Sequence, residues 1–409
     1  MVVLRRLYTS RGNSGSRKIE ATSNRRLSSV DALRGMVMIL MALDHIRDFF
    51  NSSAMYFLPD DLTRTTPALF FTRWITHFCA PTFMFTAGIG AFLWWKRGRT
   101  KLELSRFLWT RGLWLVVLDM TVVRLAFTFG AGPLLLTVLW ALGWSMIILG
   151  FLVYLPIRLL AILSVVVIAL HNLTDSVNAS QFGQAAWLWN VLHQPGAVRV
   201  GGIFVMFAYP LVPWFAVMAA GYCFGEILLF DPERRRRWMI HIGLAATIAF
   251  IIIRGLNIYG DPQPWSSKAP GMIVLSFLKV TKYPPSLDFL LMTLGPAILL
   301  LALFERIPFS FRNPLIVFGR VPLFYFLIHL YVIHGLAVLF ALLRYGHAGF
   351  MLTPLPSMGG SMKVYPPGFG YSLGTVYCVW LAVVVLMYPL CLWFADVKKR
   401  RRDWWLSYL

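Results

Sequence analysis

The sequence has few charged residues and few cysteines. Only 13% of its 409 residues are charged, whereas 58% are hydrophobic, and the mean hydropathy is +0.68. This balance excludes an ordinary soluble domain and predicts a polytopic membrane protein. The four cysteines, at positions 79, 223, 378 and 391, lie within apolar stretches at no metal-ligand spacing. We therefore expect neither a disulfide framework nor a metal site.

Acidic residues are also scarce, with 17 Asp and Glu against 38 Lys and Arg, so the formal net charge is +21. In a soluble chain this excess would suggest nucleic-acid binding, but in an apolar chain its placement matters more, and no nucleic-acid partner is expected. The basic clusters lie at positions 5–26, 96–106, 234–237 and 398–402. By the positive-inside rule they face the cytosol, which places both termini there and requires an even number of spans.

Apolar runs of about 20 residues predict an all-α transmembrane bundle with about ten spans. The runs cover approximately residues 28–50, 69–95, 106–127, 133–154, 157–172, 203–229, 238–258, 287–304, 314–343 and 373–395. We expect one membrane domain over residues 28–395, flanked by basic cytosolic tails at 1–27 and 396–409. The basic, Ser-rich start fits a bacterial cytosolic tail or an organellar transit peptide, and we favour the bacterial inner membrane.

The first predicted span contains ionisable residues. Arg34 and His45 lie eleven residues apart, and eleven steps of about 100° return to the same helix face roughly 16 Å further along. Asp31 and Asp48 fall close to that stripe, and Asp44 lies at its edge. Charged groups at membrane depth are costly and usually face a protein interior, so we expect the chemistry in this span.

His45 is the first candidate for a catalytic base, because Asp44 and Asp48 can orient its ring and stabilise the imidazolium. His77, in the second span, is the second candidate. It follows Arg73 by one turn and lies at about the depth of His45, and Arg73 is a candidate for substrate contact. The alternative is that these histidines are hydrogen-bonded core residues.

The ninth predicted span enters from the same side as the first, and Arg320 is its counterpart to Arg34. Two guanidinium groups near a cytosolic opening are suited to phosphate groups. Alternatively they pair within the protein, with Asp31 as the partner of Arg34 one turn away. His329 and His334 follow Arg320 in this span and are candidates for substrate contact.

Three segments, in this order and at these depths, resemble a known family. They are residues 26–35 (RLSSVDALRG), 81–88 (PTFMFTAG) and 319–329 (GRVPLFYFLIH). They are similar to the heparan-α-glucosaminide N-acetyltransferase catalytic-domain family of multispan acyltransferases. The Asp-x-x-Arg opening, with a histidine eleven residues after the arginine, also resembles the broader transmembrane sugar O-acyltransferases. The resemblance extends from about residue 26 to the last span.

The resemblance implies transfer of an acetyl or other acyl group from cytosolic acyl-CoA to a hydroxyl or amine of a glycan or glycolipid across the membrane, with a catalytic histidine. Arg34 then matches the motif arginine, His45 matches the histidine of the O-acyltransferase spacing, and Arg320 with His329 matches the late Gly-Arg segment. As our own hypothesis, Arg34 and Arg320 hold the CoA phosphates, with Asp31 beside Arg34. The lysosomal enzyme of the family has its catalytic histidine in the loop after the first span. This chain has no histidine at positions 51–76, so His45 or His77 must take that role.

The expected partners are therefore the bilayer, acyl-CoA as co-substrate and an extracytoplasmic glycan, without a metal, and a homodimer is an open alternative. Two other functions remain open. A proton-coupled permease would also place ionisable residues inside spans. A structural membrane protein without turnover would leave those intramembrane charges unexplained.

Overall fold

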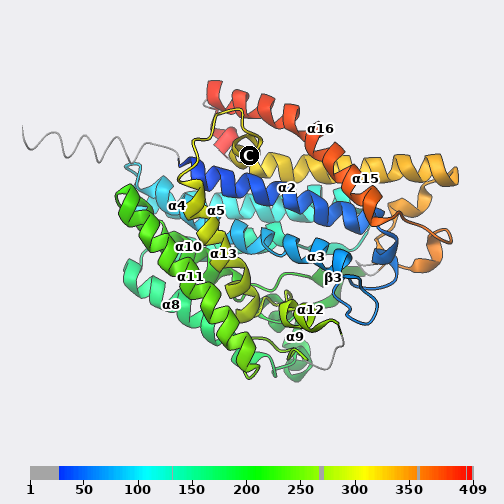
Figure 1. The fold of residues 1–409 in the computed structure, drawn as a ribbon, viewed down its shortest axis with the longest axis horizontal. Coiled ribbons are helices and arrows are strands. Elements are labelled where there is room, and N and C mark those ends of the chain that lie inside the picture. Colours follow the sequence, from blue (N-terminus) through cyan, green and yellow to red (C-terminus); the bar gives the residue numbers. More distant parts are fainter. Residues whose placement is uncertain (1–26, 131, 267–270, 357–359, 402, 408–409) are drawn as a thin grey trace, which may run out of the picture.

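The computed structural model describes residues 27–130, 132–266, 271–356, 360–401 and 403–407. Within them the chain forms an elongated bundle whose main helices run roughly along one axis (Figure 1). The main helices are α2 (Ser28–Phe50), α3 (Pro67–Thr76), α4 (Cys79–Trp95), α5 (Lys101–Leu118), α7 (Val138–Leu152), α8 (Ile157–Leu170), α10 (Trp214–Phe224), α11 (Pro232–Leu256), α13 (Leu287–Phe304), α14 (Pro314–Arg320), α15 (Pro322–Tyr345) and α16 (Leu373–Arg400). Shorter helices are α6 (Arg124–Thr128), α9 (Ala186–Leu192) and α12 (Ile273–Leu278).

Local sequence signals explain where many of these helices begin. Side-chain oxygens accept hydrogen bonds from backbone N–H groups of the first turn, which satisfies donors that have no partner within the helix. The capping residues are Thr66, Thr100, Asp231, Ser286, Asn313 and Ser372. At α5 the cap is reciprocal, because Glu103 also accepts from the backbone N–H of Thr100.

Among the residues that the structure describes, six helical segments are long and apolar enough to cross a membrane, and this marks the chain as an integral membrane protein. They are Pro67–Trp95, Ile157–Thr174, Pro232–Leu256, Leu287–Phe304, Pro322–Tyr345 and Leu373–Arg400. The apolar segments Val138–Leu152 and Trp214–Leu229 are shorter. The predicted count of about ten spans and the cytosolic location of both termini stay predictions.

The prediction of an all-α protein is confirmed for most of the described residues, but three short strands also form. The predicted fourth and sixth spans begin in strands rather than helices: β1 (Leu134–Leu136) and β3 (Ile203–Phe207). β3 pairs in parallel with β1 and antiparallel with β2 (Gly196–Val200). A short apolar run does not reveal whether it forms a strand or a helix, and here Gly201 and Gly202, both at positive φ, form the hairpin turn.

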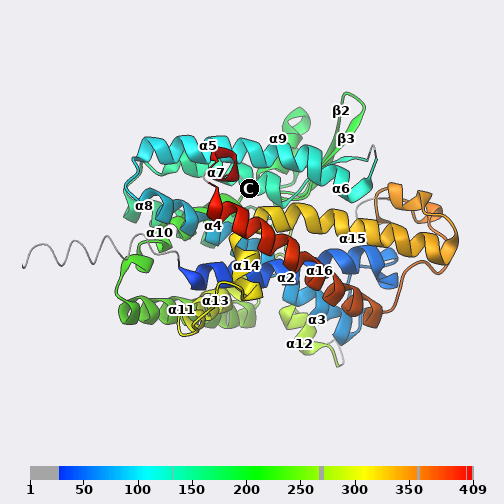
Figure 2. The same cartoon turned by 90° about the horizontal axis from the view of Figure 1, so that it is seen from above.

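Helix α2 is the centre of the bundle. It packs against α3, α4, α13, α14, α15 and α16. Seen from above, it lies between α5 at one edge and α11 at the other (Figure 2). Its buried side chains include Leu33, Val37, Ile46 and Phe49. Asp31 and Arg47 are also buried, and the other ionisable residues of this helix, Arg34, Asp44, His45 and Asp48, are half-buried. They thus face protein, as expected for charged groups at membrane depth.

Glycine pairs allow four helix pairs to approach closely. At the crossing of α2 and α14, a Cβ on Gly35 would overlap the carbonyl oxygen of Leu315, and a Cβ on Gly319 would overlap that of Asp31. Small residues allow such backbone contact between membrane helices. Facing glycines also occur at α4–α10, α5–α7 and α11–α13, as the pairs Gly88 and Gly221, Gly112 and Gly143, and Gly243 and Gly295.

We predict that Gly319→Ala destabilises the protein, because the added methyl group must push α14 away from α2. Overpacking of this kind costs about 1–3 kcal/mol. Gly335→Ala is the matched control, because Gly335 lies in α15 with open space around its Cβ position. It should be neutral or stabilise by roughly 0.5–1 kcal/mol. Thermal unfolding of the purified protein in detergent measures both, and equal melting temperatures would contradict the prediction.

Candidate active site

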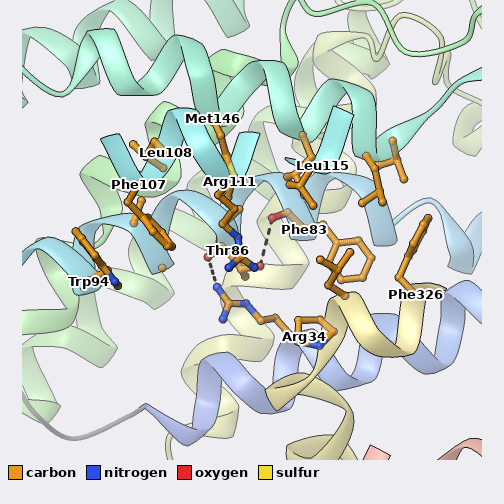
Figure 3. Close-up of a pocket in the computed structure, with 18 of the residues that line it drawn as sticks. Arg34, Phe83, Thr86, Trp94, Phe107, Leu108, Arg111, Leu115, Met146 and Phe326 are labelled. Carbon is orange, nitrogen blue, oxygen red and sulfur yellow. Dashed lines mark hydrogen bonds between the residues drawn. The ribbon is translucent and has the colours of Figure 1, made fainter. Parts of the chain in front are cut away.

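A cavity of about 250 Å³ lies between α2, α4, α5, α7 and α15. Two arginines project into it, Arg34 from α2 and Arg111 from α5. Their side chains point towards each other near Thr86 of α4 (Figure 3). Arg34 donates a hydrogen bond to the carbonyl oxygen of Thr86. The cavity thus has a cationic region formed by two guanidinium groups, which suits an anionic ligand.

The rest of the cavity wall is mostly apolar. Near one end the ring of Trp94 stacks on that of Phe107, with 4.6 Å between centroids, and the Arg99 guanidinium lies 4.1 Å from the Trp94 ring centroid. Phe326 lines the opposite end (Figure 3). The wall between includes Met38, Phe83, Leu108, Leu115, Val138, Leu139, Leu142, Met146 and Leu323. An elongated ligand with an anionic part at the arginines and an apolar remainder matches this lining.

A pair of histidines lies beyond Phe326. The ring of His329 is 5.7 Å from that of Phe326, and the ring of His45 is 5.4 Å from that of His329, measured between centroids. Nδ1 of His329 lies 2.6 Å from the Phe326 carbonyl oxygen and 3.0 Å from that of Tyr325. Because carbonyls only accept, Nδ1 carries the proton, and in the neutral ring Nε2 has a free lone pair.

Two nitrogens of this pair lack partners. Nε2 of His329 and Nδ1 of His45 are buried without a hydrogen-bond partner among the described residues. Unpaired buried polar atoms are uncommon in folded proteins, and a catalytic role is one of the reasons for which they occur. The histidine pair is therefore the strongest candidate for proton transfer in the described part of the chain.

The two aspartates expected to orient His45 contact arginines instead. Asp44 accepts from Arg73 Nη1 at 2.6 and 2.7 Å and lies 3.0 Å from Arg47 Nη2. Asp48 accepts from Arg47 at 2.6 Å. The expectation that Asp44 or Asp48 holds the ring of His45 is wrong for Nδ1, which has no partner in the described residues. Asp44 anchors α3 to α2 through Arg73. Both carboxylates neutralise Arg47, whose exposure is only 3%.

His77 lies on the other side of this ionic cluster. It is buried, its Nδ1 lacks a partner among the described residues, and its ring is 5.3 Å from that of Phe289. With Arg73 it lines a small surface indentation, too shallow to hold a water molecule, near the loop that follows α2. The other lining residues are Asp60, Phe70, Trp74, Lys279 and Val280. His77 is thus brought together with Arg73, as predicted, while His45 contacts His329.

His334 has no free ring nitrogen. Nδ1 lies 2.7 Å from the carbonyl oxygen of Ala126 and Nε2 lies 2.9 Å from that of Met351. Its ring stacks on Phe129 with 3.9 Å between centroids. These contacts tie α15 to α6 and to the segment after α15. They favour a structural role over the substrate contact predicted for His334.

Arg34 and Arg320, predicted to bind phosphate together, do not line the same cavity. Arg320 Nε lies 3.7 Å from Asp31 Oδ2, and the Arg320 guanidinium stands 4.1 Å from the Phe311 ring centroid. The residues that line the cavity include Arg34 but neither Arg320 nor Asp31. Asp31 therefore faces Arg320 across the α2–α14 crossing, where Gly35 and Gly319 bring the two backbones together.

Sequence reasoning missed two residues of the cavity, Arg111 and Phe326. Arg111 lies inside the predicted third span, so the rule that intramembrane charges are functional could have identified it. Phe326 carried no such signal, because it is one of 32 phenylalanines in an apolar chain. The buried Arg47 was missed as well, although it lies between Asp44 and Asp48.

A sequence model of one protein family matches this chain. The family is described as heparan-alpha-glucosaminide N-acetyltransferase, catalytic, and the match covers residues 26–264, more than half of the chain. It includes Arg34, His45, His77 and Arg111 and ends before α13. No curated protein matches the chain.

We predict that Asp44→Asn strongly destabilises the protein. The substitution removes the negative charge that faces Arg73 and Arg47, and loss of one partner from a buried ion pair costs about 3–5 kcal/mol. Asp403→Asn is the control, because Asp403 forms an exposed pair with Arg401 at 4.0 Å and its loss should cost at most about 1 kcal/mol. Thermal unfolding in detergent tests this, and a melting temperature for Asp44→Asn equal to that of the control would refute the assignment.

Proposed function

Because this chain belongs to the heparan-α-glucosaminide N-acetyltransferase catalytic family, we propose that it is a membrane acyltransferase. In this proposal the donor is cytosolic acyl-CoA, and the acceptor is a hydroxyl or amine of a glycan or glycolipid on the non-cytosolic side. The observation that carries the proposal is the cavity, with Arg34 and Arg111 projecting into it and the His329–His45 pair beyond Phe326. A bacterial inner membrane is the proposed location, and a homodimer is compatible with the proposal.

Arg34 and Arg111 are the proposed ligands of the CoA phosphates. Guanidinium groups bind phosphate through paired, charge-assisted hydrogen bonds. The apolar lining then accommodates the pantetheine arm, which extends towards Phe326. In this arrangement Arg320 and Asp31 fix α14 against α2. They support the cavity from outside rather than contact the donor.

His45 is the proposed general base, with His329 beside it. A histidine nitrogen removes the proton of the acceptor hydroxyl or amine as that group attacks the thioester carbonyl. The new C–O or C–N bond forms, the C–S bond breaks, and the CoA sulfur takes up the proton. A two-step route through an acyl-histidine uses the same residues, and trapping with labelled donor in the absence of acceptor distinguishes the routes.

The acceptor is proposed to approach from the end of the bundle that holds the loop after α2. Arg73 and His77 lie beside Asp60 of this loop. Asp44 holds Arg73 in place, and Asp48 holds Arg47. Arg73 and His77 are therefore proposed to help position the acceptor. Their polar side chains suit the hydroxyl groups of a sugar.

We predict that Arg34→Ala and Arg111→Ala each weaken acyl-CoA binding about tenfold or more, because each removes a charge-assisted hydrogen-bond donor. Arg106→Ala is the control, because Arg106 lies on the same helix as Arg111 but is exposed. Arg320→Ala should lower stability more than donor affinity. Isothermal titration of acetyl-CoA into the purified protein measures these effects. If Arg34→Ala and Arg111→Ala both bind acetyl-CoA as tightly as the wild type, the proposed donor site is ruled out.

We predict that His45→Ala and His329→Ala abolish most acyl transfer while acyl-CoA affinity stays within about twofold of wild type. Loss of a general base lowers turnover typically by a factor of about 10²–10⁴. The measurement is release of the CoA thiol from acetyl-CoA with and without glucosamine-terminated glycans. A permease would instead show substrate flux that follows a pH gradient and ignores CoA, and that result would overturn the proposal.

A further inference from the structure

We propose that Phe326 limits the length of the acyl group that the enzyme accepts. This inference rests on the proposed function, because it assumes that the donor lies in the cavity with its thioester directed towards the histidines. It assigns Phe326 as the specificity-determining residue at the end of the cavity nearest the histidine pair.

The position of Phe326 is the first observation. The cationic groups Arg34 and Arg111 project into the cavity, and Phe326 lines the end away from Trp94 (Figure 3). If the phosphates bind at the arginines, the thioester and its acyl group are the parts of the donor that reach furthest towards Phe326. The phenyl ring then lies against the far end of the acyl group, and the ring centroid of His329 is 5.7 Å from that of Phe326.

The enclosure behind Phe326 is the second observation. Phe326 is 4% exposed, and both Tyr325 and His329 are 0% exposed. Space opened by truncation of the ring would therefore join the cavity to the region beside His329 and not to the outside. The backbone there is held in place, because the Phe326 carbonyl accepts the hydrogen bond from His329 Nδ1. Truncation should thus extend the cavity without releasing the histidine.

The apolar character of this end explains why length is selected. Leu323, Leu115 and Met38 line the cavity together with Phe326, and close-packed interiors do not absorb extra methylenes without strain. One additional methylene in such a pocket changes discrimination by roughly tenfold or more. A chain longer than acetyl must displace the Phe326 ring, whereas in Phe326→Ala it would fill the space that the ring leaves.

The test compares the binding of CoA, acetyl-CoA and hexanoyl-CoA by isothermal titration to the full-length protein in detergent. We expect the wild type to bind hexanoyl-CoA at least tenfold more weakly than acetyl-CoA. In Phe326→Ala this ratio should fall by tenfold or more, while affinity for CoA itself is unchanged. Phe326→Leu keeps an apolar side chain of intermediate size and should give an intermediate ratio. This variant tests the proposal even if the alanine variant does not fold.

Phe324→Ala is the matched control. It removes the same side chain from the same helix, but its ring stacks on Phe394 of α16 with 4.3 Å between centroids, and it should leave the ratio unchanged. If the wild type binds none of the three ligands, the proposed function fails. If it binds them but the ratio is the same in wild type, Phe326→Ala and Phe326→Leu, the assignment of Phe326 fails while the proposed function stands.

Discussion

The structure depends on contacts that join ionisable side chains of α2 to three neighbouring helices. Hydrocarbon offers no hydrogen bonds, so a helix with this many polar groups is stable only within protein. Asp31 faces Arg320 of α14, Arg34 donates to the Thr86 carbonyl of α4, and Asp44 binds Arg73 of α3. Each contact fixes a different neighbour around the same axis. The polar residues that raise the free energy of inserting α2 into the bilayer thus also determine which helices pack around it.

Much of the helical arrangement could be predicted from the sequence, because apolar runs and helix caps are local signals. Helical geometry also placed Arg34 and His45 on one face, and in the structure both lie towards the part of α15 that holds Phe326 and His329. The partners could not be predicted. Whether Asp44 contacts His45 or Arg73 depends on how α3 is rotated relative to α2. The residue pattern of a single helix does not determine that rotation. The hairpin of β2 and β3 was hidden for a similar reason, since a five-residue apolar run fits a strand or a helix.

Two histidines of α15 show why residue type alone does not identify function. His329 and His334 lie five residues apart in the same apolar helix, and both are fully buried. Carbonyl oxygens face both nitrogens of His334 but only Nδ1 of His329. The His334 ring is therefore held in place as a structural link between segments, whereas the His329 ring retains an unpaired nitrogen, Nε2, near His45. That difference arises from α6, which is remote from α15 in sequence, and from the segment that directly follows α15.

The family match ends at residue 264, yet α14, α15 and α16 all pack directly on α2. The end of the shared segment is therefore not the edge of a separable folding unit. A chimera that exchanged residues 26–264 with those of a relative would transplant Gly35 and Asp31 without Gly319 and Arg320, the surface against which they fit. Grafting between members of the family must preserve the complementarity of this helix crossing, because the shared half and the remaining half form one interior.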